Sequence, residues 1–253
     1  MNHFSVPLWE NQQTMSWKKT WLFFAWQSIQ HAKSREHFQK IWSYKKNWSA
    51  SFAKGRNSIA DELPWINFLA RDFLTQKLRP DFKVFEFGGG GSTLFFCKNV
   101  AEVVTVEDNP DWFKILTETV QAKGYSNWRG FFVSPEPSND SSPRSQANPA
   151  HFKSSVRGLE DMSFEKYART IDQFPIEYFD LILVDGRARP SCIQQAIPRL
   201  KKGGLLVVDN TERSHYLQYF QEIIEAQFVL EEASNSPIAY TPDFTQTTIL
   251  RKK

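Results

Sequence analysis

The chain has 253 residues, of which 41% are hydrophobic, and its 31 Lys and Arg against 28 Asp and Glu give a formal net charge of +3. Its 22 Phe, 9 Trp and 7 Tyr supply enough large apolar surface to offset the entropy of ordering the chain, which excludes disorder as the dominant state. The length suits one large domain with an extension.

Residues 1–60 form an extension that differs from the rest of the chain. They hold six of the nine Trp, and nine Lys and Arg against two acidic residues. Large apolar residues recur in them at loosely helical spacing, which predicts helices packed on the main domain as a lid or an interface. The longest apolar run, residues 21–26, is far short of the roughly 18 that a membrane-spanning helix needs, so we expect no membrane span.

Residues 61–253 follow the pattern of an α/β domain. Residues 61–78 predict a helix, since acids and Pro64 stand at its start and Pro80 follows its end. Short apolar runs typical of buried parallel strands follow at residues 84–87, 103–106, 131–133, 181–184 and 205–208. Helices are expected between them at residues 93–100, 111–123, 191–200 and 215–226. This alternation predicts a doubly wound, mostly parallel sheet with helices on both faces.

Two segments depart from that plain pattern. Residues 134–151 contain four Pro and five Ser with few large apolar side chains, so we expect a long flexible loop or active-site flap. Residues 228–232 and 246–250 predict two strands with no helix between them. Such a pair must be antiparallel, and we expect it at the C-terminal end of the sheet.

A glycine-rich turn joins the first predicted strand to the next helix. The segment Glu86-Phe87-Gly88-Gly89-Gly90-Gly91-Ser92 allows a tight turn and lets a ligand approach the backbone at the helix N-terminus. A simple strand-to-helix bend would have the same composition. The next strand ends in Glu107, nineteen residues past Gly88, where an acid can accept both ribose hydroxyls of an adenosine.

These features also suit a nicotinamide-binding fold, but three details favour another ligand. Thr93 stands where G-x-G-x-x-G has its last glycine, Glu86 precedes the first glycine by two residues, and the sheet ends in an antiparallel pair. From about Leu63 to the C-terminus the sequence resembles the class I S-adenosylmethionine-dependent methyltransferases. The resemblance implies that S-adenosylmethionine contacts Glu86, Gly88, Gly89, Gly90 and Ser92, while Glu107 holds the ribose and Asp108 lies near the adenine.

The same resemblance places the methyl-transfer site at the end of the fourth strand. Asp185 and Arg187 follow the fourth strand, and Asp209 and Asn210 follow the fifth, so their side chains are expected at one edge of the sheet. Asp185 is then both a candidate cofactor ligand and a candidate catalytic residue, with Arg187 as a second catalytic candidate. Helix caps or surface arginines are the alternative interpretation for each residue alone.

The pair of strand-end acids also resembles the magnesium site of catechol-type O-methyltransferases. By that resemblance Asp185, Asp209 and Asn210 would bind Mg²⁺ through oxygen atoms. The chain departs from that pattern at Ala188, where the family has a lysine. Arg187 and Arg189 flank this position but stay protonated, so they suit an anionic substrate group or the cofactor carboxylate better than the role of base.

His215, shortly after the fifth strand, is a candidate proton acceptor, with a surface position as the alternative. Cys97 and Cys192 fall inside apolar helix faces, where buried thiols are common. Two cysteines are too few for a disulfide framework, so we expect a reducing, cytoplasmic location.

The sequence therefore predicts methyl transfer from S-adenosylmethionine to a small molecule, with a hydroxyl acceptor favoured over nitrogen or carbon. The near-neutral charge argues against nucleic acid as a partner, and a homodimer through the extension is an alternative to a lid. Three rivals remain. The first is an aminopropyl transferase of the spermidine-synthase type, but that family has an acid inside the glycine run and this chain has none. The second, a nicotinamide oxidoreductase, is more distant. The third is a non-catalytic cofactor-binding scaffold, which would need neither Asp185 nor Asp209.

Overall fold

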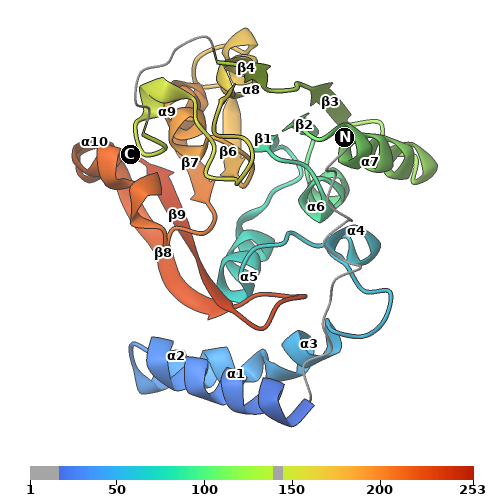
Figure 1. The fold of residues 1–253 in the computed structure, drawn as a ribbon, viewed down its shortest axis with the longest axis vertical. Coiled ribbons are helices and arrows are strands. Elements are labelled where there is room, and N and C mark those ends of the chain that lie inside the picture. The colour runs from blue at the N-terminus through green and yellow to red at the C-terminus, as the bar shows by residue number, and fades with distance from the viewer. Residues whose placement is uncertain (1–16, 139–144) are drawn as a thin grey trace.

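The computed structural model describes residues 17–138 and 145–253, which fold around one seven-stranded sheet (Figure 1). The strand order is β3-β2-β1-β6-β7-β9-β8. The strands are β1 (Lys83–Phe87), β2 (Glu102–Glu107), β3 (Trp128–Phe132), β6 (Phe179–Val184), β7 (Leu200–Val208), β8 (Phe228–Pro237) and β9 (Phe244–Lys252). The first five are parallel, and β9 runs antiparallel to both β7 and β8. The predicted mostly parallel sheet with an antiparallel C-terminal pair is confirmed.

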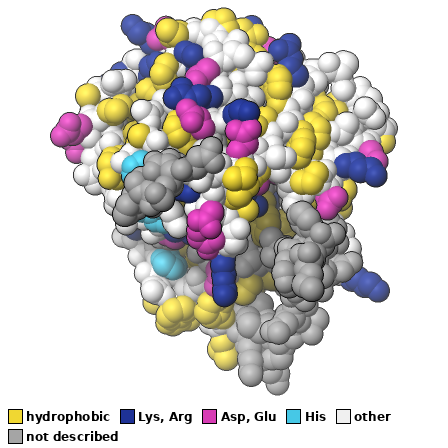
Figure 2. All heavy atoms as spheres, turned by 45° about the horizontal axis from the view of Figure 1, so that its top comes forward, with side chains coloured by type: hydrophobic (Ala, Val, Ile, Leu, Met, Phe, Trp, Pro, Cys, Tyr) yellow, Lys and Arg dark blue, Asp and Glu magenta, His cyan; other side chains and the backbone are white. Residues whose placement is uncertain are grey.

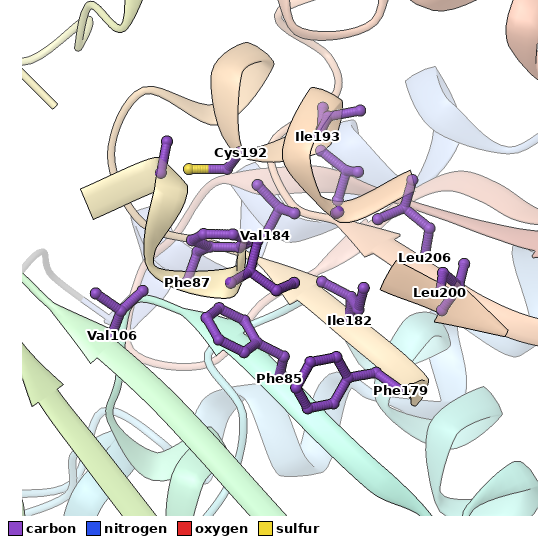
Figure 3. Packing of buried hydrophobic residues seen from close by; sticks show 14 of the residues in the cluster. Phe85, Phe87, Val106, Phe179, Ile182, Val184, Cys192, Ile193, Leu200 and Leu206 are labelled. Atoms are coloured by element: carbon purple, nitrogen blue, oxygen red, sulfur yellow. The ribbon is translucent and has the colours of Figure 1, made fainter. Parts of the chain in front are cut away.

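The central strands are apolar throughout because both faces of the sheet are covered. Alternate residues such as Phe85, Phe87, Ile182 and Leu206 point to one face, where they pack with Cys192 and Ile193 (Figure 3). Phe85 contacts Phe87 and Phe179 with ring centroids 4.7 and 5.3 Å apart. The intervening residues, among them Val84, Leu183 and Val207, pack on the other face.

Each face has its own helices. The Phe85 face carries α8 (Glu165–Arg169), α9 (Arg189–Arg199) and α10 (Gln221–Gln227). The opposite face carries α5 (Phe68–Lys77) and α6 (Gly91–Asn99), and α7 (Pro110–Ala122) packs against α6. The predicted helix over residues 215–226 is only partly right. Its first half forms two 3₁₀ turns, η3 (Ser214–Tyr216) and η4 (Gln218–Phe220), and the α-helix begins at Gln221.

The single helix predicted over residues 61–78 is wrong, because the structure has two. The helix α4 (Ser58–Asp61) ends at Glu62, whose φ of 52° is left-handed, and α5 begins only at Phe68. The carboxylate of Glu62 pairs with Lys98 and Lys123, which fixes the chain in this bend. Asn67 then caps α5 by accepting a 2.9 Å hydrogen bond from the amide of Ala70.

Residues 17–50 of the extension form three helices, α1 (Trp17–His31), α2 (Arg35–Ser43) and α3 (Lys45–Ala50). They lie together at one end of the molecule, next to the hairpin that joins β8 to β9 (Figure 1). Phe24, Ile41 and Trp48 are at most 2% exposed and pack against Phe68 and Phe244 of the main domain. The helices predicted for the extension are therefore present and share a small core with the hairpin.

The segment 134–151 is less irregular than its composition predicts. The strand β4 (Glu136–Pro137) pairs antiparallel with β5 (Met162–Ser163), and η1 (Pro149–His151) forms one 3₁₀ turn. The middle of the predicted loop, residues 139–144, lies outside the described residues.

The surface carries charges of both signs. On the face shown in Figure 2, acidic and basic side chains are interspersed among the described residues. Cys97 and Cys192 are buried free thiols, as expected. Within residues 17–138 and 145–253, no helix combines the length and apolar character needed to cross a membrane.

Candidate functional site

A cleft of about 950 Å³ lies at the carboxyl edge of the parallel strands. The glycine turn after β1 lines it together with residues that follow β2, β6 and β7. The hairpin between β8 and β9 lines it as well, through residues such as Ile238, Tyr240 and Phe244. Ligands bind in this position in open α/β sheets, because the strand ends and helix N-termini converge there.

Two glycines of the turn are required by close backbone contacts. Gly88 has a φ of +88°, and a Cβ there would lie 2.8 Å from the Cα of Gly186 in the loop after β6. A Cβ on Gly91 would lie 2.1 Å from the carbonyl oxygen of Ser58 and 2.3 Å from that of Leu63. The turn therefore packs the first residues of α6 directly against neighbouring backbone.

Glu86 supports this turn from beneath. It is fully buried, and its carboxylate accepts 2.7 Å hydrogen bonds from Ser92 Oγ and from Thr105 Oγ1, and a further one from Thr93 Oγ1. Thr93 Oγ1 in turn accepts the amide of Gly90 at 3.1 Å. Burial raises the pKa of Glu86 to about 7. Glu86 is not among the described residues that line the cleft, so it acts on the turn and not directly on a ligand.

Glu107 occupies the end of β2 and faces the cleft. Its Oε2 accepts the amide of Gly89 at 3.0 Å, and its Oε1 accepts the amides of Asp108 and Asn109 at 3.1 and 2.9 Å. The side chain is 6% exposed, and burial together with the charge of Asp108 raises its pKa to about 7. Three backbone donors therefore hold this carboxylate in one orientation.

Two further residues line the cleft near Glu107. Asp108 was predicted from the sequence as a site residue, and Trp112 was not. Asp108 lines the cleft and lies 3.3 Å from Nε of Arg187, an ion pair that links β2 to the loop after β6. Trp112, in the first turn of α7, also lines the cleft, and its Nε1 donates a 2.6 Å hydrogen bond to the carbonyl of Gly89. Its flat ring beside the glycine turn suits a planar base.

Arg189 brings the ends of β6 and β7 together. Its Nη2 lies 2.9 Å from Oδ1 of Asp185 and donates to the carbonyl of Asp185 at 3.0 Å, while Nη1 donates to the carbonyl of Asp209. Its Nε donates to the carbonyl of Gly186 at 3.2 Å. Arg189 is 8% exposed, so a nearly buried cation stands between the two predicted acidic residues. Sequence reasoning identified its charge but not this position, which follows from the i,i+4 spacing to Asp185.

The two acids differ in environment. Oδ1 of Asp209 accepts a 2.6 Å hydrogen bond from Thr247 Oγ1 of β9, and the residue is 2% exposed. Burial and the charge of Asp185 raise the pKa of Asp209 to about 8. The side chain of Asp185 is 25% exposed to the cleft, and burial raises its pKa to about 6 although Arg189 opposes the shift. Asn210, with a left-handed φ of 55°, completes this edge of the lining.

The structure brings most of the predicted site residues together. Ten of them line the cleft: Gly88, Gly89, Gly90, Ser92, Glu107, Asp108, Asp185, Arg187, Asp209 and Asn210. His215 lies on η3, with its ring centroid 4.5 Å from that of Tyr216, and is not among the described lining residues. Trp65 and Tyr240 line the end of the cleft near the hairpin, and only the fold could place them there.

No family model matches the chain, and no curated protein matches it. Solved structures do. A candidate methyltransferase from Streptococcus mutans, in complex with SAH, aligns with a TM-score of 0.50 at 15% identity over 73% of this chain and 96% of its own. A candidate O-methyltransferase from Klebsiella pneumoniae aligns with a TM-score of 0.51 at 15% identity over 84% of this chain and 89% of its own.

A third solved structure, a protein from Corynebacterium glutamicum, aligns with a TM-score of 0.52 at 11% identity over 83% of this chain and 96% of its own. Identities this low bear on the fold, and the strand order with its reversed C-terminal pair agrees with the likeness. The chain therefore has the Rossmann-like, seven-stranded fold of the class I S-adenosylmethionine-dependent methyltransferases.

Proposed function

We propose that the protein transfers a methyl group from S-adenosylmethionine to a hydroxyl group of a small molecule. The observation that carries the proposal is Glu107, whose two carboxylate oxygens are fixed by three backbone amides at the wall of the cleft, beside the glycine turn. An acid in this position suits the two adjacent hydroxyls of a ribose. The likeness in fold to a candidate O-methyltransferase agrees with this proposal.

The described residues fit S-adenosylmethionine along the cleft. Glu107 would hold the ribose, Asp108 and Trp112 would border the adenine, and the glycine turn with Ser92 would face the amino-acid part. When bound, this cofactor supplies a methyl group on a sulfonium that is already activated toward a nucleophile. The residues then have two tasks, which are to align the acceptor and to exclude water from the cleft.

Asp185 is the base that we propose for the acceptor. Its carboxylate is partly exposed to the cleft, its pKa is raised to about 6 by burial, and Arg189 fixes its Oδ1. As the acceptor oxygen takes up the methyl group, its proton passes to the carboxylate of Asp185. His215, the other candidate, is not among the described lining residues, and Arg187 is assigned to substrate contact because a guanidinium stays protonated.

The two acids for which the sequence predicted a magnesium ion lie beside a different cation, Arg189. Oδ1 of Asp185 accepts from Arg189, and Oδ1 of Asp209 accepts from Thr247. The guanidinium supplies the positive charge that two neighbouring carboxylates need, so this donor set suits an arginine better than a dication. We therefore assign no step of the reaction to a metal.

Isothermal titration calorimetry of Mg²⁺ into the protein, with and without SAH, tests the assignment of no metal to this site. We expect no stoichiometric binding of Mg²⁺ in either case. One ion bound per chain, with an affinity lost in Asp209→Asn but kept in the variant Asp81→Asn at an exposed position outside the cleft, would restore the magnesium site.

The partner that we propose is a small molecule and not a nucleic acid, because charges of both signs are mixed on the described surface of Figure 2. From the extension, Asn57 and Ser58 line the cleft, while its buried aromatic residues support the hairpin. A homodimer through α1 stays a prediction, which Leu22, Trp26 and Ile29 favour at 61, 56 and 70% exposed. Light scattering coupled to gel filtration would test it.

Calorimetry with a panel of nucleotide ligands tests the proposed function and separates it from its rivals. We expect S-adenosylmethionine and SAH to bind with one site per chain. Preference for decarboxylated S-adenosylmethionine would indicate an aminopropyl transferase, and preference for NAD would indicate an oxidoreductase. Binding of SAH with no methyl transfer to any member of a broad library of hydroxylated compounds would favour the non-catalytic scaffold.

A further inference from the structure

A second, smaller pocket of about 50 Å³ adjoins the cleft. It lies beside the N-terminus of α9, and the loop that follows η1 forms its other side through Lys153 and Ser154. Gly186, Arg187 and Arg213 line both the pocket and the cleft, so the two spaces meet there. A volume of this size holds more than one water molecule and admits a carboxylate or a phosphate.

The lining of this pocket is strongly basic. Among the described residues, four cationic side chains contribute to it and no carboxylate does: Lys153, Arg187, Arg189 and Arg213. Polar side chains of Ser154, Ser155 and Tyr216 complete much of the remaining wall. Asp108 and Asp185 pair with Arg187 and Arg189 from outside the pocket, and a bound anion would lower the electrostatic free energy of the positive charge that is left.

Lys153 is the clearest case of a cation in this pocket that lacks an acidic partner. The residue is 8% exposed, and its Nζ donates a 2.5 Å hydrogen bond to the carbonyl of Glu160. Among residues 17–138 and 145–253 that carbonyl is the only partner of its Nζ, and no acidic side chain pairs with it. A nearly buried ammonium group without a counter-ion is costly, and a bound anion would remove that cost.

Two arginines have donors that no described residue uses. Arg187 contacts Asp108 through Nε alone, which leaves both its Nη atoms without a hydrogen-bond partner in the described part of the chain. Arg213 donates to the hydroxyl of Tyr216 through Nη1 at 3.1 Å, and its Nε is 4.0 Å from Glu212. Arg189, by contrast, is fully engaged with the backbone and with Asp185, and contributes charge only.

We propose that this basic pocket binds an anionic oxygen group of the acceptor, a carboxylate or a phosphate, and thereby positions the acceptor hydroxyl at Asp185. This inference rests on the proposed methyl transfer and narrows its substrate to hydroxylated anions. Arg187 and Arg213 supply forked donors that match two oxygen atoms, and Lys153 supplies a point charge. The start of α9 adds positive potential, because its N-cap residue, Ala188, has no side chain that could accept a hydrogen bond from the free amides there.

Binding of inorganic phosphate and of acetate to the full chain tests the pocket, with chloride at equal ionic strength as the reference. We expect phosphate to shift the amide resonances of Ser154 and Arg213 with a dissociation constant on the order of a millimolar. Arg213→Gln should weaken this binding about tenfold or more, because one charged donor is lost. The matched control is Arg251→Gln, because Arg251 lies on β9 and pairs with Glu231 of β8. This variant should leave phosphate binding unchanged.

Arg213 is an exposed residue, so its variant should fold, and equal melting temperatures would verify this. Lys153→Gln provides a second variant with the same expected loss. Comparison of the two anions identifies the group that the pocket prefers. Equal phosphate binding in wild type, Arg213→Gln and Lys153→Gln would overturn the proposal.

SAH titrations of the same proteins separate the two proposals. We expect SAH affinity to be the same in Arg213→Gln as in wild type, and phosphate to bind equally with SAH present. Competition between phosphate and SAH would assign the pocket to the cofactor carboxylate and overturn the acceptor site. Failure of SAH to bind wild type would instead refute the proposed function, whatever the phosphate result.

Discussion

At the scale of single residues, the two buried glutamates at the ends of β1 and β2 have different tasks. Glu86 accepts three hydroxyl groups beneath the glycine turn, whereas Glu107 accepts three backbone amides and faces the cleft. The sequence predicted that both residues would contact the cofactor. Only Glu107 lines the cleft, because the hydroxyls of Ser92, Thr93 and Thr105 surround Glu86, and these partners come from separate elements that the sequence alone does not bring together.

Replacement of Glu107 tests its role as the ribose acceptor. Glu107→Ala should weaken SAH binding by about 1.5 to 3 kcal/mol, about one to two decades in affinity, because two charged hydrogen bonds in a nearly buried site are lost. Calorimetry would measure the change, with Glu118→Ala on the exposed face of α7 as control. Equal affinities in folded Glu107→Ala and wild type would remove the basis for assigning the ribose to this residue.

The raised pKa of Glu86 predicts a pH dependence of stability. Burial favours the protonated carboxyl, so its stabilising contribution is complete below about pH 4.5 and is lost as the pH rises through about 7. The variant Glu86→Gln lacks this titration. Its free energy of unfolding should therefore rise relative to wild type by about 3 kcal/mol between pH 4.5 and 8.

Urea denaturation of both proteins at several pH values would measure that difference, and Glu118→Gln would control for an exposed glutamate. A difference that stays constant across this pH range would mean that Glu86 is ionised in the folded protein throughout.

At the scale of elements, every strand of the seven-stranded sheet was predicted, although β3 begins at Trp128 and not at Phe131. The helices were predicted less closely. Buried parallel strands are apolar on both faces, so each run in the sequence marks one strand directly. Helix boundaries depend on tertiary contacts that the sequence does not display. Glu62 ends α4 because Lys98 and Lys123 hold its side chain, and the chain from Ser214 to Phe220 forms 3₁₀ turns where a helix was expected.

The glycine turn gives a prediction with an internal control. Gly91→Ala should lower the free energy of unfolding by roughly 3 kcal/mol or more, because its Cβ would lie within 2.3 Å of two backbone carbonyl oxygens. Gly90→Ala should change it by no more than about 1 kcal/mol, since its Cβ would meet only the ring of Trp112 at 3.6 Å. Thermal and urea unfolding would compare the two. Similar stabilities would show that α6 does not pack on α4 in the way described.

At the scale of the whole molecule, the extension and the cleft are coupled through the hairpin between β8 and β9. Trp48 donates a 3.0 Å hydrogen bond from Nε1 to the carbonyl of Thr241, and Phe24 packs on Phe244 with ring centroids 5.4 Å apart. Thr241 and Phe244 also line the cleft. The sequence predicted helices packed on the main domain, but not that they would support the wall at the hairpin, because that contact joins residues about 200 positions apart.

Truncation of Trp48 tests this coupling. Trp48→Ala should lower the free energy of unfolding by about 3 to 5 kcal/mol and speed amide exchange in the hairpin, because a side chain that is 2% exposed is lost from the small core. Trp26→Ala, at a residue that is 56% exposed, should change stability by less than about 0.5 kcal/mol. If both variants unfold alike, the extension does not support the hairpin.

A crystal structure of the protein grown with SAH is the sharpest test of the proposed cofactor site. We expect SAH in the cleft, with both ribose hydroxyls within hydrogen-bond distance of Glu107, the adenine beside Trp112, and the sulfur on the side of Asp185. An empty cleft at saturating SAH, or SAH bound with its ribose away from Glu107, would refute the proposed function.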